Sequence, residues 1–432
     1  MKKLKMPKQV GWLIPGLQVK RWFALIFIGT VLMTVGILIL FDIKPVYYTM
    51  QFISKIATKI STEWLAFGIV MFGAAFFFKG WQKTNLSILD IDDDRDNDVL
   101  LENLYKRRKL NRGPRVVAVG GGTGLSMLLS GIKNITNNIT AVVSVGDDGG
   151  SSGRLRESLG ILPPGDIRHC ITALADDEDL VTKLFKYRFK NGEGLEGHSF
   201  GNLLLTALCA ITGNMASAVK ACASVITIRG RVLPATLDDM KLSAEMEDGR
   251  IIHGESNIPE AGGKIVRLYS EPSDCKALPE VIEAIKHAEL IILGPGSLYT
   301  SVIPNLLIKE ISQEIAKSKA KKIYVCNIMS QPGETDGYKV SDHLKALLLH
   351  SGENKLVDAV LVNNSVPENI DPKYANSGSY PVEFDGNEVK KLGVQVCAKN
   401  LIEPNKNGLV RHSSRNVARS IYYWFRKGDN KK

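Results

Sequence analysis

The stretch VVAVGGGTGL, from Val116 to Leu125, decides the fold class of this 432-residue chain. An apolar, β-branched run ends in four glycines within five positions, and a helical pattern follows. Glycine lets backbone N–H groups approach an anion closely, and the next helix adds the positive end of its dipole. The stretch therefore predicts a phosphate-binding turn after the first strand of an α/β sheet. A merely tight strand–helix turn is the alternative.

Short apolar runs alternate with helical patterns from residue 115 onward, which favours a parallel sheet with helices on both faces. The expected strands are VVAV, ITAVVSV, ELIILG, KKIYVCNI and DAVLVN. The expected helices cover residues 124–133, 201–211, 215–225, 278–287, 301–317, 340–350 and 413–425. Residues 229–269, including RVLPA, indicate a smaller antiparallel insertion. We predict a Rossmann-like, doubly wound, mostly parallel α/β fold that binds ligands at the carboxyl ends of its strands.

Two apolar segments precede this domain, at residues 22–41 and 60–78. The first has roughly the length that spans a bilayer, about 20 residues. Lysine and arginine before the first segment and after the second place both ends in the cytoplasm, with a short loop at 42–59 outside. A cleaved signal peptide is the alternative. We expect a transmembrane hairpin at 1–88, a charged linker at 89–113 and a cytosolic domain at 114–432.

The net charge of +10 does not indicate a nucleic-acid partner, because it belongs to the membrane end. Residues 1–83 hold 11 Lys and Arg against 2 Asp and Glu, or +9, which leaves 10 − 9 = +1 for the remainder. The 6 cysteines form no CxxC pair, so we expect buried free thiols in a reducing compartment.

Carboxylates follow the second expected strand, where Asp147 and Asp148 begin DDGGSSGRLR. Adjacent acids at this place suit a ribose, a sugar or a divalent cation such as Mg²⁺. Asp166, in PPGDIRH, is a third carboxylate, which in this hypothesis the fold brings near Asp147 and Asp148. A solvated turn would use the same residues.

Cations and polar groups lie in neighbouring glycine-rich segments. Arg154, Arg156 and Arg168 are expected in loops, where guanidinium groups suit phosphate. Asn202, in HSFGN, precedes an apolar helix and is either a ligand contact or a helix cap.

A second glycine-rich loop, GPGSLYTS, follows the strand ELIIL. Its Gly294, Gly296 and Ser297 predict another backbone anion site on the same sheet edge. The first turn departs from the dinucleotide fingerprint, because Gly124 comes one residue early and Leu125 holds the last glycine position. A nicotinamide-dependent oxidoreductase is therefore a weaker interpretation.

The ordered set GGGTGL, DDGGSSGRLR, PPGDIRH, GHSFGNLLL, AEMEDG, GES, GPGSLYTS, YVCNIMSQPGET and VRH resembles the gluconeogenesis-factor family. These CofD-like proteins are relatives of 2-phospho-L-lactate transferase. The resemblance implies a cytosolic Rossmann-like protein that binds UDP-sugars such as UDP-N-acetylglucosamine and controls cell-wall synthesis and cell shape under gluconeogenic growth. It implies ligand-binding roles for Tyr374 and Arg411. The alternatives without a ligand are an aromatic residue in a loop for Tyr374 and a surface cation for Arg411. Transferase relatives hold a metal at the position of Asp147 and Asp148.

We expect a membrane-tethered UDP-sugar sensor rather than an enzyme. The expected ligand-binding residues are Gly121, Gly122, Thr123, Gly124, Asp147, Asp148, Arg154, Asp166, Asn202, Gly294, Gly296, Ser297, Tyr374 and Arg411. The rivals are a Mg²⁺-dependent phospholactyl or nucleotidyl transferase and a scaffold with a vestigial pocket. Expected partners are cell-wall synthesis or regulatory proteins and a Ser/Thr kinase acting at Ser413 or Ser414. A homo-oligomer is compatible with the sequence.

Overall fold

The computed structural model describes residues 27–33, 40, 44–57, 64, 67–68, 70–72, 75, 79, 109–176, 178–352, 354–366, 370–403 and 408–427. The chain divides into two units, Met1–Lys109 and Leu110–Lys432.

Among the described residues of the N-terminal unit, helix α2 (Lys44–Ala57) occupies the segment where we expected a short loop. Its sequence KPVYYTMQFISKIA groups apolar positions at helical spacing, which explains the helix. The predicted spans at 22–41 and 60–78 lie largely outside the described residues, as does most of the predicted linker at 89–113. Of the described helices, none is by itself long and apolar enough to cross a membrane. Helices α9 and α10 together have the length and composition of a span, but the chain bends by 116° between them.

A seven-stranded parallel sheet organises the second unit, in the order β10-β9-β8-β7-β1-β2-β3. Its strands are β1 (Val116–Gly120), β2 (Ile139–Val143), β3 (Arg231–Pro234), β7 (Leu290–Leu293), β8 (Lys321–Val325), β9 (Ala359–Asn363) and β10 (Gln395–Lys399). The strand order reverses between β1 and β7. In doubly wound sheets, ligands bind beyond the carboxyl ends of the strands at such a reversal.

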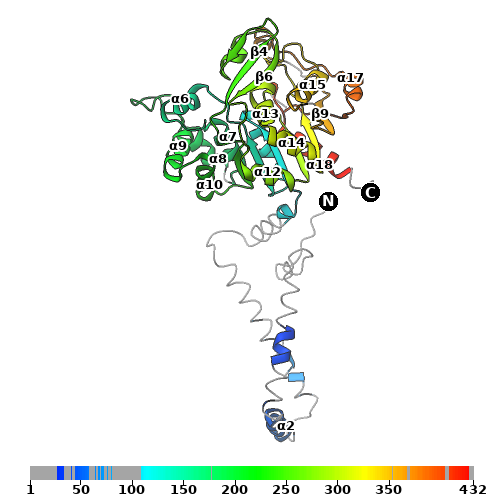
Figure 1. Cartoon of the computed structure of the whole chain (residues 1–432). Coiled ribbons are helices and arrows are strands. Elements are labelled where there is room, and N and C mark those ends of the chain that lie inside the picture. The colour runs from blue at the N-terminus through cyan, green and yellow to red at the C-terminus, as the bar shows by residue number, and fades with distance from the viewer. Residues whose placement is uncertain are drawn as a thin grey trace. The chain divides into compact units, whose positions relative to one another are not determined.

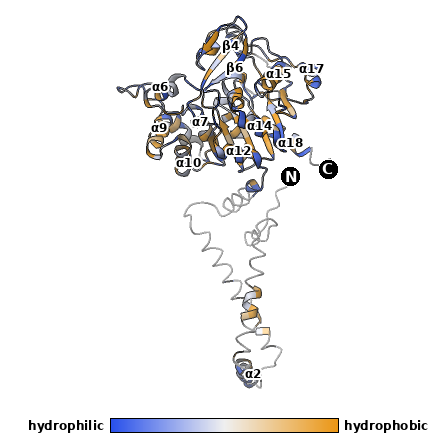
Figure 2. Cartoon of the chain, in the orientation of Figure 1, coloured by the Kyte–Doolittle hydropathy of each residue, from blue (hydrophilic) through white to orange (hydrophobic). Residues whose placement is uncertain are grey.

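The central strands form because they are apolar on both sides. Every residue of β1, β2 and β7 is buried, as expected of a parallel sheet covered on two faces. The strands of this sheet accordingly carry mostly apolar colour in Figure 2. The edge strand β10, with sequence QVCAK, was not predicted, because its mixed exposure gives no continuous apolar run.

Helices cover the sheet in two layers. One layer holds α5 (Gly122–Ile132), α7 (Gly165–Leu174) and α18 (Ser414–Lys427), and the other holds α12 (Pro279–Lys286), α13 (Ile303–Leu307) and α14 (Lys309–Lys317) (Figure 1). An outer group packs around α7 and β3: α6 (Gly150–Leu159), α8 (Glu178–Lys186), α9 (Phe200–Thr212) and α10 (Met215–Val225). The remaining helices are α11 (Asn257–Glu260), α15 (Val340–His350), α16 (Pro372–Asn376) and α17 (Gly386–Lys391).

A smaller antiparallel sheet confirms the predicted insertion, but its bounds differ from the prediction. It contains β4 (Lys241–Met246), β5 (Ile251–His253) and β6 (Ile265–Glu271), in the order β5-β4-β6. The segment RVLPA does not belong to it. Strand β3 pairs in parallel with β2, with Val232 opposite Ala141, and is the edge of the large sheet.

Two further expectations were wrong. The predicted helix at 301–317 is three elements, a π-helical turn η2 (Leu298–Val302), α13 and α14. Pro304 lacks an N–H, and Ile308 adopts an extended conformation that breaks the helix. Arg154 and Arg156 lie on α6 and Arg168 on α7, not in loops, although glycines frame these segments.

Candidate functional site

A cleft of about 280 Å³ opens beyond the carboxyl ends of β1 and β7, where the strand order reverses. The loop after β1, the loop after β7, the segment after β8 and the C-terminal VRH segment all contribute to it. Its lining residues are Gly121, Gly122, Thr123, Gly124, Pro295, Gly296, Ser297, Ser301, Asn327, Ile328, Met329, Gln331, Val410, Arg411 and His412. The two predicted glycine loops therefore share one cleft.

The first wall is the turn into α5. Gly122 has φ +60°, a conformation that side chains other than glycine rarely adopt. Gly121 precedes the helix with no side-chain cap, so the first N–H groups of α5 remain available at the cleft, apart from that of Gly122, which donates to Asp166. A Cβ on Gly121 would lie 2.5 Å from an oxygen of Asp166 and 2.6 Å from Ser144 Oγ. Glycine is required here because the acid approaches the turn so closely.

The second wall is the loop after β7, and it touches the first wall through backbone atoms. A Cβ on Gly124 would lie 2.4 Å from the carbonyl oxygen of Pro295 and 2.7 Å from the Cα of Gly296. Gly294, with φ +70°, connects β7 to this loop directly beside the end of β1. Packing of glycine against backbone therefore brings the amide donors of both loops to one place.

Side-chain amides fix the second wall. Asn327 donates from Nδ2 to the Gly296 carbonyl at 2.9 Å and to Gln331 Oε1 at 3.0 Å, and the Gly296 N–H donates to Asn327 Oδ1 at 3.4 Å. Gln331 Nε2 in turn donates to Ser297 Oγ at 2.5 Å. These bonds hold the Gly296–Ser297 backbone in place before any ligand arrives, which reduces the entropy cost of binding.

The C-terminal segment closes the cleft with a cation. Arg411 is exposed at the cleft and has no ion-pair partner among the described residues. Tyr374 does not line the cleft; its hydroxyl accepts the Val410 N–H at 3.2 Å and so steadies the segment that carries Arg411. His412 Nε2 donates to the Cys326 carbonyl at 3.2 Å, and burial lowers the pKa of this histidine to about 4.

Three carboxyl groups near the glycine turn have raised pKa values. Burial, followed by repulsion from Asp147, raises the pKa of Asp166 to about 7. Burial, with repulsion from Asp147 and Asp148, raises the pKa of Glu255 to about 8. Burial is also the main cause of the raised pKa of Asp147. With pKa values of about 7 and about 8, Asp166 and Glu255 can exchange protons near neutral pH, where general acid–base chemistry operates.

The predicted metal ligands are engaged in hydrogen bonds. Asp148 accepts the N–H groups of Glu255 at 2.8 Å and Ser256 at 2.9 Å, and it thereby ties the antiparallel insertion to the large sheet. Asp147 accepts the Gly149 N–H at 3.0 Å. Across the residues described, no three His, Cys, Asp or Glu side chains are arranged to hold a metal ion. A metal-binding role for Asp147 and Asp148 stays a prediction.

Two other predicted ligand residues lie outside the cleft lining. Asn202 is buried, accepts from Arg168 Nε at 2.8 Å and donates to Ser151 Oγ at 3.0 Å. Arg154 donates to the Glu196 carbonyl at 3.2 Å. These residues connect α6, α7 and α9, and α7 carries Asp166. Their contacts indicate a supporting role.

Sequence reasoning missed the side chains that brace the cleft. Asn327, Gln331 and His412 occur in quoted motifs, but their residue types alone do not reveal which backbone they bind. Glu255 was also missed, because only the fold brings it to Asp147. One signal was available for Asn327 and Gln331: polar residues that follow a buried parallel strand lie at the edge of the sheet where ligands bind.

The family model described as 2-phospho-L-lactate transferase CofD matches residues 116–402. The gluconeogenesis factor of Bacillus subtilis is 49% identical over 310 residues, covering 72% of this chain and 97% of that protein. A Nostoc relative is 46% identical over 419 residues, covering 96% of this chain and 92% of its own length. Its similarity therefore extends into the N-terminal unit.

Solved structures agree with the fold. A crystal structure of a Bacillus halodurans protein is 47% identical, with a TM-score of 0.69, and covers 72% of this chain and 100% of that one. The family model covers the strands of the large sheet and both glycine loops. The chain belongs to the gluconeogenesis-factor family, which is related to the CofD 2-phospho-L-lactate transferases.

Proposed function

We propose that the cleft binds the diphosphate of a UDP-sugar, with UDP-N-acetylglucosamine as the leading ligand, and that binding regulates other proteins. One observation carries the proposal: two glycine loops and Arg411 line a single cleft at the reversal of strand order. Backbone N–H groups at a helix start and a guanidinium are the groups that bind phosphate oxygens best.

Calorimetry on the full chain tests the proposal. UDP-N-acetylglucosamine is expected to bind saturably, one per chain, while uridine monophosphate binds more weakly because it lacks the second phosphate. Arg411→Gln removes a charge-assisted hydrogen bond worth about 1.5–3 kcal/mol, which corresponds to roughly 10–100-fold in affinity. Arg415→Gln is the matched control, because it removes an equal charge from an exposed residue of α18 that does not line the cleft. Equal affinity in both variants would contradict the proposal.

A regulatory role in cell-wall synthesis and cell shape is the wider proposal. It rests on membership of the gluconeogenesis-factor family. Deleting the gene is expected to alter cell shape on gluconeogenic carbon sources, and a gene encoding Arg411→Gln is expected not to restore it. Restoration by this variant would separate the role from the cleft.

We also propose that residues 22–41 and 60–78 anchor the protein in the cell membrane, with the main domain in the cytoplasm. The supporting observation is the pair of long apolar runs with flanking basic residues. The full chain is expected to stay with membranes after carbonate washing. Release into the supernatant would contradict the anchor. Phosphorylation at Ser413 or Ser414 and self-association remain predictions for mass spectrometry and light scattering.

A transferase is the second candidate. The match to the 2-phospho-L-lactate transferase family and the raised pKa of Asp166 beside the glycine turn favour it. This candidate requires turnover of a nucleotide-activated phospho-acid in the presence of Mg²⁺, with loss of turnover in Asp166→Asn. Binding of UDP-N-acetylglucosamine without turnover of either class of compound supports the regulatory role.

A further inference from the structure

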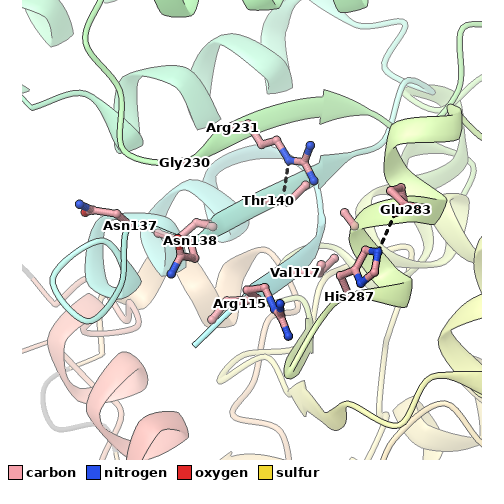
Figure 3. A pocket seen from close by; sticks show the side chains of 12 residues that line it. Arg115, Val117, Asn137, Asn138, Thr140, Gly230, Arg231, Glu283 and His287 are labelled. Atoms are coloured by element: carbon pink, nitrogen blue, oxygen red, sulfur yellow. Dashed lines mark hydrogen bonds and ion pairs between the residues drawn. The ribbon is translucent and has the colours of Figure 1, made fainter. Parts of the chain in front are cut away.

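A second hollow, of about 340 Å³, lies at the amino-terminal edge of the large sheet, opposite the edge that carries the cleft. Residues at the starts of β1, β2 and β3 form its floor and one wall, and α12 forms the other wall (Figure 3). Strand β1 has five residues, so the two edges are separated by about 15 Å of strand. The hollow is therefore distinct from the cleft.

The strand register brings three residues of different character into one row. Val117 pairs with Thr140, and Thr140 pairs with Arg231. Neighbouring residues in register point to the same face of a sheet, so all three side chains face the hollow. Figure 3 shows Arg231 and Thr140 on one side, with Val117 between them and the Glu283–His287 pair of α12.

Arg231 is the distinctive group. Its Nε donates to Thr140 Oγ1 at 2.9 Å, and the Thr140 side chain is buried. In the described part of the chain, Arg231 has no acidic partner. The threonine anchors one nitrogen and leaves the two terminal nitrogens as a fork, the geometry that binds a carboxylate or a phosphate through two hydrogen bonds.

The other ionisable groups around the hollow already have partners. Arg115 faces Glu289 at 3.6 Å, and His287 Nε2 pairs with Glu283 at 2.7 Å. The Asn138 amide donates to the carbonyl oxygens of Asn111 and Gly113. Arg231 is thus the cation in this hollow that can give its terminal nitrogens to a ligand without breaking an ion pair.

The apolar side chains at the hollow indicate what the remainder of a ligand would be. Val117, on the face of the sheet that carries Arg231, and Ala284 of α12 are the apolar side chains at the hollow. A volume of about 340 Å³ is at the lower end of small-molecule sites, which span about 300–1,000 Å³. We propose that this hollow is a second ligand site, which binds a small organic acid through the Arg231 fork and places the acid's apolar body against Val117 and Ala284. It is independent of the UDP-sugar proposal.

Three probes titrated into the full chain test this site: benzoate, acetate and inorganic phosphate. Benzoate is expected to bind saturably and more tightly than acetate, because only benzoate covers the apolar floor. Arg231→Gln is expected to weaken benzoate at least about ten-fold, the loss of one charge-assisted pair. Thr140→Val keeps the side-chain shape but releases the fork, so it is expected to weaken benzoate by less than Arg231→Gln.

The matched control is Arg411→Gln, which alters the cleft at the other edge. It is expected to leave benzoate affinity unchanged while it reduces UDP-N-acetylglucosamine affinity. Phosphate that still binds in Arg411→Gln and is lost in Arg231→Gln would show that the fork accepts phosphate as well. Denaturant unfolding of each variant checks the fold. Absence of saturable benzoate binding, or equal benzoate affinity in Arg231→Gln and the unaltered chain, would overturn the proposal.

Discussion

Replacing Gly124 with alanine tests whether the two glycine loops must touch for the cleft to exist. Alanine is the better helix former by about 0.5–1 kcal/mol, so the substitution would stabilise α5 if space allowed. The structure leaves no space, because the new Cβ would lie 2.4 Å from the Pro295 carbonyl oxygen and 2.7 Å from the Gly296 Cα. Ordinary carbon contacts need about 3.5–4.0 Å, so the loops must separate by about 1 Å.

The expected result of Gly124→Ala has two parts. Overpacking typically costs about 1–3 kcal/mol, so the free energy of unfolding should fall by about that amount in denaturant titration. Separation of the loops breaks at least one hydrogen bond to the ligand's phosphates, so UDP-N-acetylglucosamine affinity should fall about 10-fold or more.

Gly113→Ala provides the matched control for this experiment. Gly113 precedes β1, at the edge of the sheet opposite the cleft, and its new Cβ would lie 2.6 Å from Thr136 Cβ. This variant should lose stability but keep ligand affinity. If Gly124→Ala became more stable and bound the nucleotide normally, the proposed backbone contact between the loops would be refuted.

Three other substitutions probe single groups of the site. Asp166→Asn should flatten the pH dependence of stability: the folded pKa of about 7 lies above the ordinary 3.8, so the native state loses up to about 4 kcal/mol as the pH rises from about 4 to 7. Urea titrations at several pH values measure the free energy of unfolding. If its dependence on pH were the same in Asp166→Asn as in the unaltered chain, the raised pKa of Asp166 would be contradicted. Asn327→Asp places a carboxylate 2.9 Å from the Gly296 carbonyl and 3.0 Å from Gln331 Oε1, so calorimetry should show about 10-fold weaker nucleotide binding. Affinity equal to that of the unaltered chain would mean that this amide does not brace the loop. Tyr374→Phe removes only the acceptor of the Val410 N–H and should weaken binding by less than Arg411→Gln does. A larger loss would indicate direct contact between Tyr374 and the ligand.

The sheet was predictable because parallel strands buried on both faces are continuous apolar runs. Strands β1, β2, β7, β8 and β9 were each visible in this way. Strand β3 was assigned to the wrong sheet, because the four residues RVLP carry no signal that distinguishes parallel from antiparallel partners. Register between distant segments depends on packing, which a local pattern does not contain.

The glycine walls of the cleft were predictable for a similar reason, since few other residues allow such close backbone approach. The roles of the polar side chains were not. The sequence pattern at Asp148 did not show that its carboxylate accepts the Glu255 and Ser256 N–H groups, which only the fold brings to it. The expected ligand-binding role of Tyr374 likewise gave no hint that its hydroxyl accepts the Val410 N–H. A side chain's partner is set by residues far away in sequence.

A crystal structure of the full chain with UDP-N-acetylglucosamine tests the central claim most directly. The account predicts the diphosphate between the Gly121–Gly124 turn and the loop of Gly296, with the Arg411 guanidinium on a phosphate oxygen. Electron density for the nucleotide at any other place, or an empty cleft at saturating ligand, would contradict it.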